Sequence, residues 1–324
     1  MSADGPSAAP PRRIVVDCDP GHDDAVALLL AAGHPGLALA GITTVAGNQT
    51  LERVTRNARI VATVVGLAGV PIVAGSAAPL VRPLRIAPEY HGESGLDGPA
   101  PVAPTVELTP GRAASFLADV VLADPGRVTV VATGPLTNLA LALRLAPEIA
   151  GTDERVVLMG GSYTRGNSTP AAEFNVLVDP EAAAAVFSAG WEVTMIGLDV
   201  THRALFTPAV AGRLAAVDTA AARWMAELMT FFGTAYRTAG GMDAPPVHDA
   251  VAVACASDPS LVAVQPAWVQ VETAGALTTG MTVVDFRAGV PGASGAPGPR
   301  HQVGVDLDVE RFWALVLDAV ARLN

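Results

Sequence analysis

Four aspartates stand within eight residues near the start of the chain, in the run DCDPGHDDA at 17–25. Carboxylates this close repel one another and raise one another's pKa unless a cation lies among them. Capping of a helix and a turn at Pro20 and Gly21 account for about two of the four. The residue types indicate a hard divalent cation instead, because such ions take several oxygen ligands, and Asp19 and Asp24 can both reach it.

The spacing of these residues excludes two other kinds of metal site. The twelfth residue counted from Asp19 is Leu30, where an EF-hand needs a bidentate glutamate. The 2 cysteines, Cys18 and Cys255, are isolated, and the 6 histidines are scattered, so no zinc pattern exists. We expect both cysteines to be buried thiols in a reducing compartment.

Further residues that bind ligands in other proteins follow the later strand-like segments of the chain. They are Asn48, Thr133, Met159, Asn167, Glu173, Asn175, His248 and Asp249. Each has an ordinary explanation when taken alone, such as an Asx-turn, a helix cap or a core methionine. Together they place carboxylates, amides and one imidazole at the edge where an α/β sheet binds ligands.

Strand-like and helix-like segments alternate along the chain and position these residues. The predicted strands are 14–16, 37–44, 71–73, 128–132, 156–159, 193–196, 267–271, 281–286 and 302–307. The predicted helices are 25–32, 50–66, 113–123, 139–145, 181–188, 208–237 and 309–323, with a further helical run at 250–256. The pattern predicts an α/β fold, a mostly parallel central sheet flanked by helices, with the site at the C-terminal ends of the strands.

No long polar linker divides the chain. We expect a disordered tail over residues 1–12 and a single α/β domain over residues 13–324. The Gly- and Pro-rich run at 289–300 reads as a surface loop.

Composition excludes several functions. The formal net charge is −11, which disfavours binding to nucleic acid or to an anionic membrane. All 20 basic residues are arginines, and the absence of lysine excludes Schiff-base chemistry, pyridoxal phosphate attachment and a Walker-type phosphate site. The longest apolar stretch, 60–73, is too short to span a membrane, and residues 1–13 lack the pattern of a signal peptide. We therefore expect a cytoplasmic protein.

Seven motifs in order resemble the inosine–uridine-preferring nucleoside hydrolase family over almost the whole chain. They are DCDPGxDDA, TTVxGN, HGESG (91–95), VLMGG (157–161), AEFN (172–175), DPEAA (179–183) and VHD (247–249). The resemblance implies a Rossmann-like α/β fold, a homodimer or homotetramer, and tightly held Ca²⁺. It also implies that the substrate is a small-molecule ribonucleoside, purine or pyrimidine, cleaved at the N-glycosidic bond to ribose and free base.

The same resemblance implies a metal site and its chemistry. The implied calcium ligands are Asp19, Asp24, the main-chain carbonyl of Thr133, and Asp249. Asp19 is then the general base for a calcium-bound water, and Asp17 orients its neighbours.

The substrate contacts implied by the resemblance fall into three groups. The lower ribose hydroxyls are assigned to Asp23, Asn48, Asn175 and Asp249. The 5′-hydroxyl is assigned to Asn167 and Glu173, and the wall of the sugar pocket to Met159. On the base side, His248 is the leaving-group acid, and His91 and Tyr236 are candidate base contacts.

One position departs from the family pattern, and two other functions compete. His22 stands where an apolar or hydroxyl residue is expected, and we expect its ring to point away from the metal. The D-x-D run also opens the motif of Mg²⁺-dependent phosphatases with an Asp nucleophile, although these need a downstream cation that is typically lysine. A non-catalytic ribose- or nucleoside-binding protein is the second alternative.

Overall fold

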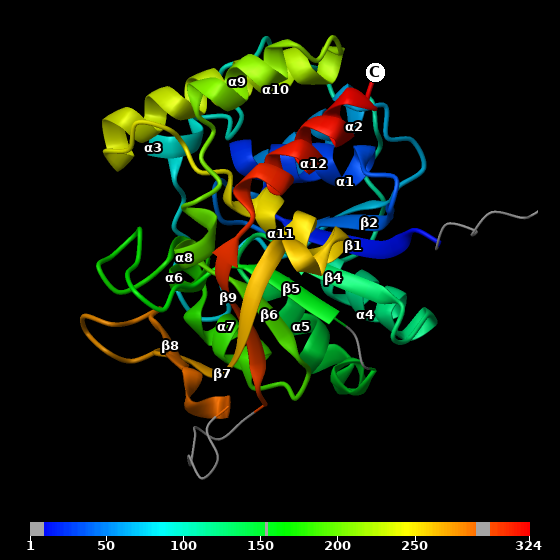
Figure 1. The fold of residues 1–324 in the computed structure, drawn as a ribbon. Helices are drawn as coiled ribbons and strands as arrows, with labels where there is room; N and C mark the ends of the chain where they lie inside the picture. Colours follow the sequence, from blue (N-terminus) through cyan, green and yellow to red (C-terminus); the bar gives the residue numbers. More distant parts are fainter. Residues whose placement is uncertain (1–9, 153–154, 290–298) are drawn as a thin grey trace, which may run out of the picture.

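The computed structural model describes residues 10–152, 155–289 and 299–324. Its centre is a nine-stranded sheet in the order β3-β2-β1-β4-β5-β6-β9-β7-β8 (Figure 1). The strands are β1 (Arg12–Cys18), β2 (Leu37–Thr44), β3 (Ile72–Ala74), β4 (Val128–Ala132), β5 (Arg155–Met159), β6 (Val193–Ile196), β7 (Val262–Val271), β8 (Thr282–Asp285) and β9 (His301–Leu307).

Seven strands are joined by parallel pairings, from β3 at one side to β9. Strand β7 then pairs antiparallel with both β9 and β8. The prediction of a mostly parallel α/β sheet is confirmed. Because parallel strands end at the same edge, the residues that follow β1, β2, β4 and β5 are brought together there.

Helices cover both faces of this sheet (Figure 1). The twelve α-helices of the described residues are α1 (His22–Gly33), α2 (Leu51–Val64), α3 (Pro88–His91), α4 (Ala113–Ala123), α5 (Thr137–Leu145), α6 (Phe174–Val178), α7 (Pro180–Phe187), α8 (Leu198–Thr201), α9 (Pro208–Ala215), α10 (Ala220–Ala235), α11 (His248–Ser257) and α12 (Val309–Ala321). Helices α1, α2, α10, α11 and α12 share one hydrophobic cluster, and α4, α5 and α7 share a second on the other face. None of the helices in the described parts of the chain has the length and apolar character needed to cross a membrane.

The differences from the predicted elements have local causes. Helices α3, α6 and α8 have four or five residues each and were not predicted, because one turn is too short to show a period. The predicted helix at 208–237 is two helices, α9 and α10, followed by a π-helical turn at Tyr236–Gly240. Thr50, the first residue of the predicted helix at 50–66, lies at the N-cap of α2, and its side chain makes no capping hydrogen bond. The predicted 289–300 loop lies largely outside the described residues.

The first strand and helix form the base of the site. β1 is buried from Ile14 onward, and the chain leaves it through Pro20 and Gly21 into α1. α1 begins at His22, three residues before the predicted segment 25–32, so Asp23 and Asp24 lie in its first turn. The positive end of the helix dipole therefore faces these two carboxylates.

The far end of α1 packs directly on α12, and this contact gives a test of the fold. A Cβ added at Gly33 would lie 2.1 Å from the main-chain oxygen of Ala319. We expect Gly33→Ala to lower the free energy of unfolding by roughly 1–3 kcal/mol, because backbone atoms of α12 must shift. Gly212→Ala in α9 is the matched control, since an added Cβ there meets nothing within 4 Å and should stabilise the helix by up to about 1 kcal/mol. Urea unfolding measures both, and equal stability of the two variants would contradict the packing.

Candidate active site

A cavity of about 780 Å³ opens at the carboxyl ends of the parallel strands. Eleven of the residues singled out in the sequence line it: Asp23, Asn48, His91, Thr133, Met159, Asn167, Glu173, Asn175, Tyr236, His248 and Asp249. Three others, Asp17, Asp19 and Asp24, are fully buried and do not line the cavity. The candidate residues thus gather in one site, with part of the acidic run beneath its floor.

Three carboxylates converge at this floor. Oxygen atoms of Asp23, Asp24 and Asp249 all lie within 4.8 Å of one another, and all three residues are buried. Asp23 and Asp24 come from the first turn of α1, and Asp249 comes from the first turn of α11. Helix α11 begins at His248, two residues before the predicted helical run, which explains how Asp249 reaches the other two.

Neutral donors fix the orientation of Asp24. Its carboxylate accepts hydrogen bonds from the main-chain N–H of Gly21 (3.0 Å), the hydroxyl of Thr133 (2.8 Å) and the amide of Asn48 (3.2 Å). The last two donors come from the ends of β4 and β2. Three elements of the sheet therefore hold one carboxylate without supplying a positive charge.

Asp19 and Asp17 lie deeper. One carboxylate oxygen of Asp19, Oδ2, accepts the main-chain N–H of Asn48 at 2.7 Å. The other, Oδ1, is buried and has no hydrogen-bond partner among the described residues. Asp17 accepts from the Thr43 hydroxyl at 2.6 Å and from the Asn138 amide at 2.8 Å, so it ties β1 to β2 and α5.

Burial raises the pKa of every carboxyl group in this cluster, and repulsion from neighbouring carboxylates adds to the shift of Asp19, Asp23 and Asp249. Burial raises the pKa of Asp23 to about 8, with a further contribution from Asp24. Burial first, and then neighbouring carboxylates, also raise the pKa of Asp19 and of Asp249 well above their usual range. Burial raises the pKa of Asp17 to about 7, against the hydrogen bonds from Thr43 and Asn138.

The donor set fits a hard divalent cation. Every group at the floor offers oxygen, and the free Oδ1 of Asp19 is a buried ligand atom without a partner among the described residues. No ion pair of the described residues includes Asp19, Asp23, Asp24 or Asp249. The converging trio contains Asp23 and not Asp19, one oxygen of which accepts the main-chain N–H of Asn48.

Amides and a glutamate form the next wall of the cavity. The Asn175 amide donates to the Thr133 carbonyl (2.8 Å) and to the Met159 carbonyl (3.3 Å), which joins the ends of β4 and β5. The Glu173 carboxylate caps α6 and accepts three main-chain N–H groups, those of Gly161, Asn175 and Val176. The side-chain amide oxygen of Asn167, Oδ1, accepts the main-chain N–H of Phe174. The Asn167 side chain thereby holds its own loop against α6.

A histidine and two tyrosines form another wall. His248 Nε2 lies 3.0 Å from the Tyr236 hydroxyl, and Nδ1 lies 2.7 Å from the Thr201 hydroxyl. The ring of Tyr236 packs against that of Tyr90, with centroids 5.0 Å apart. Burial lowers the pKa of His248 to about 3, so the ring is neutral in the protein without substrate.

His22 does not contact the carboxylates through its ring. Its imidazole stacks on Phe231 and Phe232, and its nitrogens contact the Asp97 carbonyl and the ring of His91. The side chain thus supports the cavity wall from behind His91.

The cavity also contains polar residues that the sequence analysis did not single out. They are Arg85, Glu89, Arg165, Ser168 and His202. His202 follows β6 through the single-turn helix α8, so the strand-end argument could have found it. Arg85 and Glu89 come from the segment before and within α3, where the sequence carries no periodic signal.

Fold and cavity together define an α/β protein with an acidic, oxygen-rich ligand site at the strand ends. The profile of a family described as inosine-uridine preferring nucleoside hydrolase matches residues 14–314 of the chain. The chain therefore belongs to this family, and it is a hydrolase enzyme. The family resemblance predicted from the motifs is confirmed.

Individual relatives match this chain over nearly its full length. An inosine-uridine preferring nucleoside hydrolase of Crithidia fasciculata is 48% identical over 319 residues, covering 97% of this chain and 99% of the relative. A pyrimidine-specific ribonucleoside hydrolase, RihA, of Shewanella sp. (strain ANA-3) is 46% identical, covering 96% of each chain. The solved structure of a plant nucleoside hydrolase superposes with a TM-score of 0.91 at 31% identity, covering 96% of this chain and 99% of that one.

A cation bound among these carboxylates would remove their mutual repulsion and therefore raise the melting temperature of the protein. Saturating Ca²⁺ should raise the melting temperature by on the order of 5 °C, since a ligand at a hundred times its Kd stabilises the folded state by about 2.7 kcal/mol. Asp24→Asn should lose most of this shift. Asp218→Asn, a change at an exposed carboxylate, is the control and should retain it. Differential scanning fluorimetry with and without chelator measures the effect, and an unchanged shift in Asp24→Asn would remove Asp24 from the site.

Proposed function

We propose that this enzyme hydrolyses the N-glycosidic bond of purine and pyrimidine ribonucleosides to ribose and free base, with Ca²⁺ as cofactor. The observation that carries the proposal is the convergence of Asp23, Asp24 and Asp249 under a cavity lined with amides and carboxylates. Cleavage of a glycosidic bond passes through a positively charged sugar, which such an environment stabilises. Family membership favours this activity over a phosphatase or a non-catalytic binder.

The proposed metal ligands are Asp19, Asp24, the carbonyl of Thr133 and Asp249. Their support is the all-oxygen donor set and the unpartnered buried Oδ1 of Asp19. When bound, Ca²⁺ would balance the carboxylate charge and polarise a water molecule and the ribose diol. Asp17, held by Thr43 and Asn138, keeps the end of β1 in place without touching the cavity.

The chain's own groups then carry the reaction. Asp19 takes a proton from the attacking water, whose oxygen bonds to C1′ as the bond from C1′ to the base nitrogen breaks. The lower ribose hydroxyls are assigned to Asp23, Asn48, Asn175 and Asp249. The 5′-hydroxyl is assigned to Asn167 and Glu173, with Met159 along the sugar. Main-chain donors already fix the Glu173 carboxylate, which supports a positioning task for it.

Contacts with the nucleobase of the substrate are assigned to His248, Tyr236 and His91. The departing base takes up a proton, and we propose that His248 supplies it together with the Tyr236 hydroxyl 3.0 Å away. Since His248 is neutral in the free protein, the ring must first take up a proton from solvent in the complex with substrate. The Thr201 hydroxyl on the other ring nitrogen holds the imidazole in place.

Several broader assignments belong to the same proposal. We propose a homodimer or homotetramer located in the cytoplasm, with no nucleic-acid or membrane partner, in keeping with the net charge of −11. We also propose one domain over residues 13–324. The two hydrophobic clusters that pack on the common sheet support that boundary.

Replacement of the proposed base tests the mechanism. Asp19→Asn should lower kcat on the order of a hundredfold to ten-thousandfold, because the amide cannot accept the proton. It should retain part of the affinity for ribose, measured as product inhibition. Asp218→Asn again serves as the exposed control. Turnover like that of the wild type would rule out Asp19 as the base.

A substrate panel tests the activity itself. Inosine, adenosine, guanosine, uridine and cytidine should release ribose in the presence of Ca²⁺, and chelator should abolish the release. A 2′-deoxyribonucleoside should react with kcat/KM lower by about three orders of magnitude or more, since buried polar groups are then left unpaired. Release of phosphate from p-nitrophenyl phosphate, with no ribose release from any nucleoside, would reverse the proposal in favour of a phosphatase.

A further inference from the structure

The imidazole rings of two histidines are in contact at the wall of the cavity, one lining the wall and the other behind it. His22, in the first turn of α1, and His91, at the end of α3, have Nδ1 atoms 3.3 Å apart although they are 69 positions apart in sequence. His91 lines the cavity, whereas His22 is 0% exposed and stacks on Phe232 with ring centroids 5.0 Å apart and planes 5° apart. His22 therefore reaches substrate only through His91.

One hydrogen bond fixes the proton on His22. Its Nε2 lies 2.8 Å from the main-chain carbonyl oxygen of Asp97. A carbonyl oxygen only accepts, so Nε2 carries the hydrogen. Burial among aromatic rings disfavours the charged form of both imidazoles, which leaves one hydrogen on each ring. The Nδ1 atom of His22 then presents a lone pair to His91.

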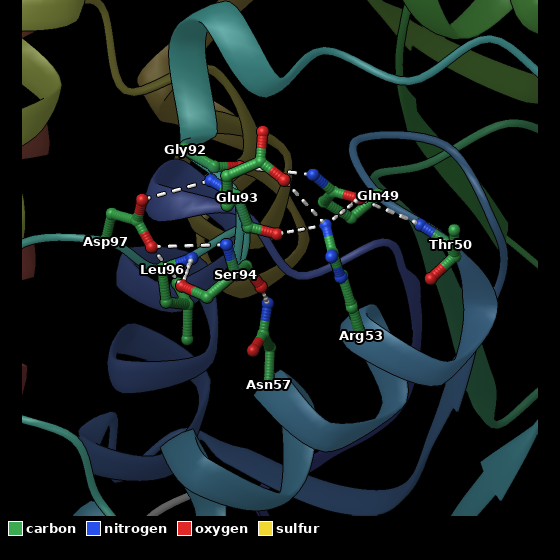
Figure 2. A network of polar contacts seen from close by, with 9 residues as sticks. All are labelled: Gln49, Thr50, Arg53, Asn57, Gly92, Glu93, Ser94, Leu96 and Asp97. Atoms are coloured by element: carbon green, nitrogen blue, oxygen red, sulfur yellow. Dashed lines mark hydrogen bonds and ion pairs between the residues drawn. The ribbon is translucent and has the colours of Figure 1, made fainter.

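A network of polar contacts holds the turn that contains Asp97 (Figure 2). The Asp97 carboxylate accepts the main-chain N–H groups of Glu93 and Ser94. The Ser94 carbonyl accepts the Asn57 amide at 2.9 Å, which ties this turn to α2. The orientation of the His22 ring is thus set by a network that does not touch the cavity floor.

Two groups of His22 lie near His91 Nδ1, and one is a hydrogen-bond donor while the other is an acceptor. The main-chain N–H of His22 is a donor 3.3 Å away, and the His22 Nδ1 lone pair is an acceptor at 3.3 Å. A bare Nδ1 on His91 accepts from the first, and a protonated Nδ1 donates to the second. Within the described residues, His91 Nε2 has no hydrogen-bond partner, and it becomes a donor to the cavity in the first case and an acceptor in the second.

We propose that the His22 side chain gives His91 access to both neutral tautomers, so that the cavity offers either a donor or an acceptor to the nucleobase. The inference rests on the proposed function and concerns its base specificity. Uracil presents a carbonyl oxygen and a ring N–H where cytosine presents an amino group and a bare ring nitrogen. A histidine that can either donate or accept a hydrogen bond can pair with the edge of uracil and with the edge of cytosine. A residue without an acceptor at position 22 leaves only the main-chain N–H, which holds His91 as an Nε2–H donor.

The kinetic test uses two substitutions that remove this lone pair and keep the main-chain N–H. His22→Phe retains the aromatic stack, and His22→Leu retains an apolar side chain; neither offers a hydrogen-bond acceptor to His91. In both, we expect the ratio of kcat/KM for uridine to that for cytidine to change by about threefold to tenfold, the worth of one neutral hydrogen bond. His34→Gln, at the half-buried C-cap of the same helix, is the control. A change below threefold in a folded His22→Phe enzyme would overturn the proposal.

A spectroscopic readout separates this inference from the activity. In ¹⁵N-histidine spectra, with His91 assigned by its loss in His91→Asn, the wild type should show both ring nitrogens at averaged shifts. His22→Phe should show a bare Nδ1 and a protonated Nε2. A single tautomer, identical in wild type and His22→Phe, would overturn the proposal. If no ribonucleoside is hydrolysed, the proposed function fails, but these spectra still decide the tautomer of His91.

Discussion

The concentration of carboxyl groups at one buried point is the constraint around which this molecule is arranged. Asp19, Asp23, Asp24 and Asp249 are buried, and the described residues provide no ion pair for any of them. Neutral donors near the strand ends hold Asp19 and Asp24 in place, and burying the four carboxyl groups together costs electrostatic free energy. Their raised pKa values express that cost, and a cation relieves it. The protein thereby has an affinity for positive charge, which in the proposed reaction would serve both an ion and an electron-poor sugar.

The parallel sheet makes this arrangement feasible. Each strand delivers its last residues to the same edge, so contributions from distant segments meet without long loops. Thr133 after β4, Asn48 after β2 and Asn175 beside β5 each hold a neighbour as well as facing the cavity. These hydrogen bonds fix the part of the cavity that we assign to the sugar. The wall that we assign to the base depends more on short helices and side-chain rings, and the related hydrolases differ in the base that their names specify.

Much of this could be predicted from the sequence, and the failures have physical causes. The β-branched runs ending at Asp17 and Ala132 predicted parallel strands, and strand ends predicted where the polar residues gather. Short-range patterns could not reveal that α11 begins at His248, because its first turn is set by what it packs against. They could not reveal either that Asp23 joins the converging carboxylates. His22 was the least predictable, since its partner His91 lies in a four-residue helix without any periodicity.

The contact of α1 with α12 has a consequence for biosynthesis. The helix that carries Asp23 and Asp24 is translated long before the 13-residue helix that packs on its far end. The nascent chain must therefore keep that face of α1 uncovered until α12 emerges, and exposed hydrophobic surface of this kind recruits chaperones. High separation between contacting segments also slows folding after release. Deletions at the C-terminus should accordingly harm yield in cells before they harm chemistry.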